Sequence, residues 1–257
     1  MEPDSNGVPL KIAVCLKQVP STDTRVKVAA DGKRLDPTGV TLVINPYDEY
    51  ALEEALRLKE AHGGEVVAYS AGGPSVVSAL RNALAIGADA AVLLKTEAEL
   101  DSLGAARLLA AELAGKGYDL VLFGKQAVDD DAAQVPAMTA ELLQLPCATV
   151  VVKLEVAGGR AKAVREIEGG VETLDVALPA VVAAQKGLNE PRYASLKGIM
   201  AAKKKPIEEK AVEAPAPVVE TVSLTLPPAR PAGRIVGEGV DAVPELVRAL
   251  REEAKVL

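Results

Sequence analysis

The chain has 257 residues, of which 49% are hydrophobic and 25% are charged, and its formal net charge at pH 7 is −7. This length suits one large domain with an appendage or two small domains, and the hydrophobic fraction is sufficient for a core without disulfides or structural metals. An acidic chain with 2% aromatic residues and no tryptophan lacks the basic surface and the stacking platform of nucleic-acid-binding proteins.

The rare residue types exclude several kinds of site. Cys15 and Cys147 lie in apolar surroundings without CxxC spacing, which indicates free buried thiols in a reducing compartment. The single histidine, His62, provides too few ligands for a zinc site or a triad, and we expect it at the surface near a helix C-terminus. No apolar run approaches the about 20 residues of a membrane span, and residues 1–9 resemble neither a signal nor a transit peptide. We therefore expect a cytoplasmic protein of bacterial type with no metal site and no membrane insertion.

The N-terminal part of the chain begins with a buried strand, expected over residues 11–16. A polar segment follows in which the Asp-Gly pair at 31–32 is a hairpin-type turn signal, and residues 40–44 have the pattern of a short strand. A helix then starts at Asn45, with a proline at the first helical position and acidic residues in the first turn. The Gly-Gly pair at 63–64 ends that helix.

The order of strand, turn and helix then repeats. Further strands are expected over 65–70, 91–94 and 119–123, and helices over 75–86 and 103–113. Such alternation predicts an α/β fold with a doubly wound, mostly parallel sheet, a Rossmann-like nucleotide-binding architecture. The GxGxxG fingerprint of dinucleotide-binding proteins is absent.

The loop of residues 124–135 lies between a buried strand and a helix. Asp131 followed by Gln134 is a plausible variant of the capping box that opens a helix. Free backbone N–H groups at the carboxyl edge of a parallel sheet bind anionic ligands, and Lys125 adds a cation for a phosphate. Because Cys15 and the turn at 71–73 also end strands at this edge, the sequence predicts a nucleotide pocket here. On this stretch alone, an ordinary solvated loop is the alternative.

After residue 147 the pattern changes to antiparallel hairpins. Strand-like runs over 148–156, 160–168 and 171–177 are separated by Gly-Gly pairs, and residues 178–184 form a further buried strand.

A basic segment follows, with six cations and two acids between Arg192 and Lys210. Leu196, Ile199 and Met200 are apolar residues within it, and an anchor surrounded by charge is typical of a docking site. The alternative is that the lysines only complement a helix dipole.

These stretches together resemble the β subunit of electron transfer flavoprotein. The matching stretches are residues 45–47, 124–131, 164–174, 178–182, 188–193 and 199–200 with the following lysine triplet. The resemblance implies an αβ heterodimer without catalysis of its own, in which the α subunit holds most of the redox-active FAD and the β subunit keeps a structural AMP. It also implies electron donors among acyl-CoA dehydrogenases and related flavin dehydrogenases, and a quinone oxidoreductase as acceptor.

The resemblance implies two sets of residues. The AMP pocket would use Cys15, Asn45, Pro46, Tyr47, Asp48, Ala71, Gly124, Lys125, Gln126, Ala127, Val128, Asp129, Asp130, Asp131, Ala132, Ala133, Gln134 and Val135. The segment that docks dehydrogenases would be Arg192, Tyr193, Ala194, Ser195, Leu196, Lys197, Gly198, Ile199, Met200 and Ala201, with Leu196 as the anchor. Relatives can carry a modifiable lysine where this chain has Ala201, so that modification is not expected here, although Lys204 remains.

Three alternatives stay open. Some relatives bifurcate electrons and hold a second FAD in place of AMP, and the run at 17–20 resembles both branches. An ATP-using enzyme on a similar fold would need a phosphate-transfer apparatus, and the chain has no Walker A motif. A regulatory AMP sensor would exchange its nucleotide.

The C-terminal part is expected to be an arm. We expect a domain over 1–205 and an arm over 206–257, with a proline-rich linker, an exposed strand over 222–226 and an amphipathic helix from Asp241 or Val243 to near Lys255. The apolar face of that helix needs a partner, which the resemblance identifies as the α subunit.

Overall fold

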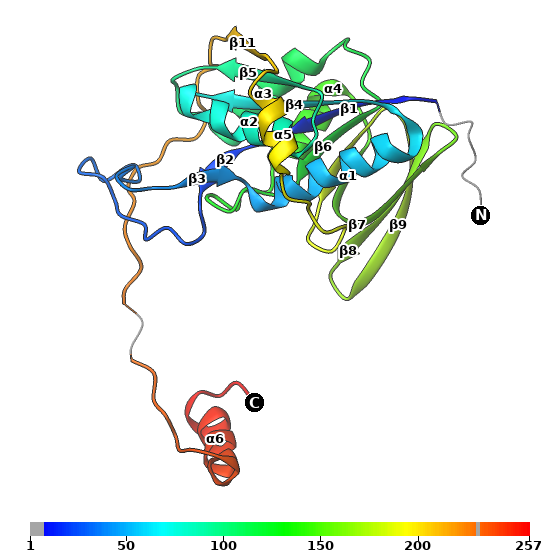
Figure 1. The fold of residues 1–257 in the computed structure, drawn as a ribbon. Coiled ribbons are helices and arrows are strands. Elements are labelled where there is room, and N and C mark those ends of the chain that lie inside the picture. The colour runs from blue at the N-terminus through cyan, green and yellow to red at the C-terminus, as the bar shows by residue number, and fades with distance from the viewer. Residues whose placement is uncertain (1–7, 230–231) are drawn as a thin grey trace.

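The computed structural model describes residues 8–229 and 232–257, and most of them surround one nine-stranded sheet (Figure 1). Its strand order is β11-β5-β4-β1-β6-β10-β7-β8-β9. The strands are β1 (Leu10–Cys15), β4 (Gly64–Gly72), β5 (Ala90–Lys95), β6 (Leu120–Gly124), β7 (Cys147–Ala157), β8 (Arg160–Ile167), β9 (Gly170–Ala177), β10 (Ala180–Ala184) and β11 (Ile207–Ala211). From β11 to β7 every neighbouring pair is parallel, which confirms the predicted doubly wound α/β fold.

Helices cover both faces of the sheet. Along β1, Ile12 and Val14 pack with α1 (Pro46–His62) and α2 (Val77–Ile86) in one core cluster. Ala13 and Cys15 point to the other face, into a cluster with α3 (Ser102–Leu113) and α4 (Val135–Leu143). The 3-10 turn η1 (Pro74–Val76) leads into α2, and α5 (Leu196–Ala202) packs on α2. Both faces of the strands are therefore buried, which explains why the parallel strands are almost continuously apolar in sequence.

The far end of the sheet is antiparallel, as the Gly-Gly turns predicted. β8 pairs antiparallel with β7 and with β9. Gly158 and Gly159 have φ of 57° and 72°, left-handed values that glycine adopts without steric cost. A separate two-stranded sheet joins β2 (Gln18–Pro20) to β3 (Leu42–Ile44), and a bridge between Val28 and Leu35 flanks the expected turn at 31–32.

The boundary expected between residues 205 and 206 is wrong. β11 continues the main sheet past that point and pairs in parallel with β5. The edge of β5 offers unpaired backbone groups, and Ile207 packs against the core, so this short segment gains both hydrogen bonds and burial. The sheet domain therefore extends through Ala211.

The expected strand over 222–226 is also absent from the part of the chain that the structure describes. Residues 212–229 run without regular secondary structure. Within the expected strand, the N–H of Leu224 donates a hydrogen bond to the backbone carbonyl of Gly32 at 2.7 Å, which is a loop contact and not a strand ladder. Alternation alone does not make a strand without a neighbouring strand to pair with.

The C-terminal helix lies where it was expected but is less regular. It comprises η2 (Val240–Ala242), α6 (Val243–Arg248) and the π-helical turn η3 (Ala249–Glu253), and Figure 1 shows it away from the sheet. Its apolar residues Val243 and Leu246 are 49% and 43% exposed. Nowhere in residues 8–229 and 232–257 is a helix both long and apolar enough to cross a bilayer.

Candidate functional site

A cavity opens at the carboxyl ends of β1, β4 and β6, where the strand order reverses. Open α/β sheets bind their ligands at such switch points. Its volume is about 150 Å³, and it adjoins a cavity of about 870 Å³ whose lining it shares at Leu100, Asp101, Ser102, Asp130, Ala132 and Gln134. The two cavities together form one continuous depression beside the loop of residues 124–135.

Most of the predicted pocket residues lie on this cavity. Those that line it are Cys15, Asn45, Asp48, Ala71, Gly124, Gln126, Ala127, Asp130, Ala132, Ala133, Gln134 and Val135. Pro46, Tyr47, Lys125, Val128, Asp129 and Asp131 are not among its lining residues. Lys125 Nζ lies 5.1 Å from the centre of the Tyr47 ring, and the cation at the cavity is Lys17. Lys17 was not among the residues predicted for the pocket, although its place directly after the first expected strand was a usable signal.

Asp48 joins three elements at the base of the site. Its carboxylate accepts hydrogen bonds from the backbone N–H of Lys17 at 2.7 Å and of Gly124 at 2.9 Å. Burial raises the pKa of this carboxyl to about 7, although the two N–H groups act in the opposite direction. Asp48 therefore holds the ends of β1 and β6 against the first turn of α1.

Asn45 holds the loop rather than the helix. It occupies the predicted cap position of α1, but its side chain makes no cap hydrogen bond. Instead, its Nδ2 donates to the carbonyl of Gln126 at 2.8 Å, and its Oδ1 accepts from the N–H of Val128 at 3.1 Å. The side chain is 1% exposed, so both loop groups depend on it for pairing.

The predicted capping box of Asp131 and Gln134 does not form. Asp131 and Ala133 have φ of 50° and 53°, and these left-handed residues turn the chain before α4 begins at Val135. The carboxylate of Asp131 accepts from Nε2 of Gln126 at 2.6 Å instead, inside the loop.

The charged lining of the cavity is mixed: Lys17 lies among Asp48, Asp101 and Asp130, and two helix N-termini add positive potential. The first residues of α3 and α4 both line it, and helix N-termini carry partial positive charge. Lys17 Nζ donates to Asp129 at 2.8 Å and to Asp130 at 2.9 Å, so the loop carboxylates are partly neutralised.

Cys15 is a free thiol, and burial, assisted by the charge of Asp48, raises its pKa well above the ordinary value. The thiol is therefore neutral and is not an activated nucleophile.

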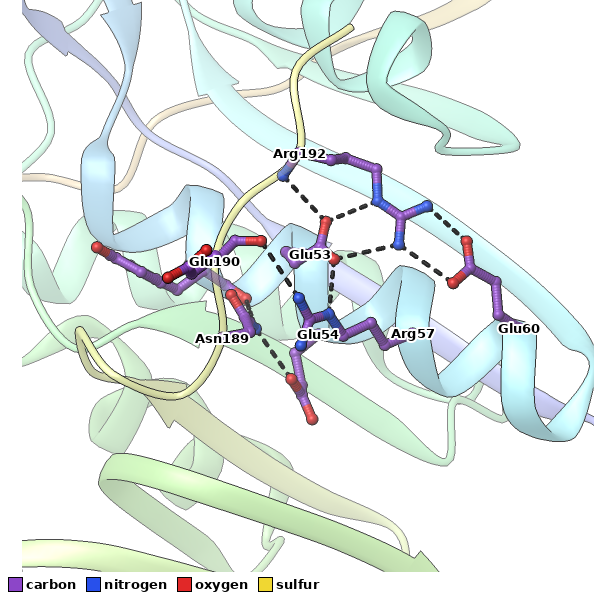
Figure 2. A network of polar contacts seen from close by, with 8 residues as sticks. Glu53, Glu54, Arg57, Glu60, Asn189, Glu190 and Arg192 are labelled. Atoms are coloured by element: carbon purple, nitrogen blue, oxygen red, sulfur yellow. Dashed lines mark hydrogen bonds and ion pairs between the residues drawn. The ribbon is translucent and has the colours of Figure 1, made fainter. Parts of the chain in front are cut away.

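The predicted docking segment, residues 192–201, forms an exposed apolar surface. Tyr193 is 97% exposed, Leu196 84% and Met200 61%. Ser195 caps α5 by accepting from the N–H of Gly198 at 3.0 Å. Arg192 is half-buried and lies against α1 instead, where its guanidinium is bonded to Glu53 and Glu60 (Figure 2). Ala194 is partly buried against the core, and Lys197, Ile199 and Ala201 are exposed.

No group of three or more histidine, cysteine or acidic side chains in the described residues is placed to hold a metal ion.

Comparison with known proteins identifies the family of this chain and agrees with the fold. The electron transfer flavoprotein domain family model matches residues 34–215. The electron transfer flavoprotein β subunit of Bacillus subtilis is 44% identical over 246 residues, which cover 91% of this chain and 96% of that protein. The β subunit of Syntrophomonas wolfei is 41% identical and that of Sus scrofa 40%, each over 96% of this chain and 98% and 99% of the relative. The chain therefore belongs to the electron transfer flavoprotein family as a β subunit, a carrier of electrons and not an enzyme.

Proposed function

We propose that this chain is the scaffold half of an αβ flavoprotein that accepts electrons from acyl-CoA dehydrogenases and related flavin dehydrogenases and passes them to a quinone oxidoreductase of the respiratory chain. In this proposal the α subunit holds most of the redox FAD, and this chain holds a structural AMP. The observation that carries the proposal is the cavity at the switch point, which Asn45 and Asp48 build from buried hydrogen bonds.

The residues around the cavity fit an adenylate. Leu16, Ala71, Leu109 and Phe123 provide an apolar slot for a base. The N-termini of α3 and α4 suit a phosphate, and Asp130 and Gln134 are acceptors and donors for ribose hydroxyls. Bound AMP supplies no redox chemistry, so the residues of this chain only bind and orient it. Retention rather than turnover is expected, because the loop that covers the site is fixed by buried side chains.

The α subunit is the expected partner of the C-terminal arm. The apolar residues of α6 are exposed in this chain, and a short helix with an exposed apolar face is marginal by itself. The dehydrogenases are expected at the docking segment, where Leu196 is the exposed anchor.

A second FAD in place of AMP is the alternative that one observation supports. The adjoining cavity of about 870 Å³ extends the site towards Asp31, Arg34 and Glu99, and a dinucleotide would need such an extension. An ATP-using enzyme or an AMP sensor has no comparable support.

The test is the composition of the purified heterodimer. Co-expressed with the α subunit, the protein should be yellow and should release one AMP, and no second FAD, on denaturation and chromatography. A colourless protein that stays monomeric beside the α subunit would refute the proposal, and two FAD per heterodimer would favour the alternative.

Leu196→Ala should slow electron transfer from a dehydrogenase while AMP content and heterodimer formation stay intact. Loss of AMP or of the α subunit would instead make Leu196 a structural residue.

A further inference from the structure

The start of the docking segment, before α5, has little apolar packing to fix its shape. A cavity of about 290 Å³ lies beneath it, lined by residues 191–194, by Glu49, Glu53 and Asn82, and by the apolar side chains of Pro46, Tyr50, Leu52 and Ile86. Tyr193 and Leu196 project into solvent, so their side chains do not fix the segment to the domain by packing. A segment built in this way would sample many conformations unless polar contacts fixed it, and ordering it on binding would weaken docking.

Arg192 supplies those polar contacts. Its Nε and Nη2 donate to the two carboxylate oxygens of Glu53 at 2.7 and 3.1 Å, and its backbone N–H donates to Glu53 at 3.2 Å. Its Nη1 and Nη2 also donate to the two oxygens of Glu60, at 2.5 and 3.1 Å. The guanidinium thus makes two forked pairs, the arrangement in which arginine fixes geometry as well as charge (Figure 2).

Glu53 is placed to anchor this arrangement. Its side chain is 3% exposed, and it also accepts from Nε of Arg57 at 2.7 Å. Burial acts to raise the pKa of Glu53, but the hydrogen bonds from Arg192 and Arg57 outweigh it and hold the pKa below its ordinary value. Glu53 is therefore a fixed anion between two cations, on the face of α1 that meets the segment.

The rest of the segment is held at its flanks. Before Arg192, Asn189 Nδ2 donates to the carboxylate of Glu54 at 2.9 Å. After it, α5 lies so close to α2 that a Cβ on Gly198 would be 2.2 Å from the carbonyl oxygen of Ala85. Residues 193–197, of which all but Ala194 are exposed, lie between these points and directly follow Arg192.

We propose that Arg192, Glu53 and Glu60 are positioning residues for dehydrogenase docking: they hold the segment in the shape that presents Tyr193 and Leu196 before the partner arrives. This inference rests on the proposed docking function of the segment. It assigns the half-buried Arg192 to contacts within this chain, although Arg192 is the first cation of a basic stretch whose sequence predicts contact with a partner.

The test uses the full heterodimer, with a purified acyl-CoA dehydrogenase as electron donor. Arg192→Ala should raise the KM for the flavoprotein about tenfold and change kcat less than about twofold. Without Arg192 the segment would become ordered only when the dehydrogenase binds, and the free-energy cost of that ordering would weaken binding. Arg192→Lys keeps the charge without the fork and should be intermediate, as should Glu60→Gln, which removes only the more exposed partner. Lys59→Ala is the matched control, because it breaks an ion pair of the same helix, with Asp89, outside the segment.

A second variant separates this inference from the proposed function. If Arg192 acts through the segment, the two substitutions should not be additive. The KM of the double variant Arg192→Ala/Leu196→Ala should then lie within about twofold of the KM of Leu196→Ala alone. Amide hydrogen exchange over residues 193–197 should accelerate in Arg192→Ala, with nucleotide and flavin content unchanged. An unchanged KM in both Arg192→Ala and Glu60→Gln, or fully additive effects in the double variant, would overturn the inference. A Leu196→Ala variant with wild-type kinetics would overturn the docking function itself.

Discussion

Asp48 accepts a hydrogen bond of 2.9 Å from the backbone N–H of Gly124, so the first turn of α1 is attached to the end of β6. The two residues are 76 positions apart in the sequence and meet at the floor of the proposed nucleotide site. Their contact leaves no room for a side chain at position 124, because a Cβ there would lie 2.5 Å from the backbone carbon of Tyr47.

Gly124→Ala should therefore destabilise the protein by about 2–3 kcal/mol and release the nucleotide, since backbone atoms must move to admit the methyl group. Denaturant unfolding and nucleotide content would measure both effects. Gly170→Ala is the control, because a Cβ at that position meets nothing within 4 Å. Equal stability of the two variants would show that α1 yields easily at Tyr47.

Asp48 should make stability depend on pH. Its carboxyl keeps a proton up to about pH 7 in the folded chain but only up to about pH 4 in the unfolded chain. The folded state therefore holds the extra proton between these values, and the free energy of unfolding should fall as pH rises through that window, by at most about 1.4 kcal/mol per pH unit. Asp48→Asn should lose this slope. Denaturation of both proteins at pH 5 and pH 7.5 measures it, and parallel pH profiles would contradict the assignment.

The loop over residues 124–135 should depend far more on Asn45 than on the side chain of Lys17. Asn45→Ala leaves the partly buried carbonyl of Gln126 and N–H of Val128 without their partner, which should cost about 2 kcal/mol. Lys17→Ala removes two ion pairs of a cation that is 45% exposed, worth less than about 1 kcal/mol. Thermal unfolding of the two variants compares them, and a larger loss for Lys17→Ala would reverse this ranking.

Asp101 should hold the C-terminal tail beside the proposed nucleotide site. One carboxylate oxygen caps α3 at the N–H of Gly104, at 2.7 Å, and the other accepts from the N–H groups of Val218 and Val219 at 2.6 and 3.1 Å. Asp101→Asn keeps an oxygen for the cap but turns an NH₂ group towards the tail. Limited proteolysis near residues 217–221 should accelerate in Asp101→Asn while the thermal stability of the domain is kept. A tail as resistant as in the wild type would mean that other contacts hold it.

The fold and the position of the site were predictable because both depend on pattern. Alternating apolar runs and glycine turns predict a parallel sheet, and the carboxyl ends of parallel strands must share an edge. That geometry alone brings Cys15, Ala71 and Gly124 to one cavity.

The roles of single side chains were not predictable, because they depend on partners that are remote in sequence. Asn45 has the sequence context of a helix cap, yet its side chain bonds to a loop 81 residues later. The left-handed backbone at Asp131 and Ala133 leaves no mark on the pattern from which a capping box was predicted. The polar run of β11 became a strand only because β5 offered it an edge.

The charge of the docking segment illustrates the same limit. The amino-acid composition of this stretch is strongly basic. In the structure, however, the carboxylates of α1 neutralise Arg192, and Lys210 pairs with Glu112 of α3 at 2.7 Å. Lys197, Lys203 and Lys204 are the cations of that stretch that remain exposed.

One helix, α1, carries both halves of this arrangement: its first turn closes the cavity, and its middle turns receive Arg192. If residues 192–201 dock dehydrogenases as proposed, moving them into another β subunit would transfer the contact residues without the carboxylates that hold them. A chimera designed to exchange dehydrogenase preference would then have to include Glu53 and Glu60, and the recipient helix would have to keep Asp48 to retain the proposed nucleotide.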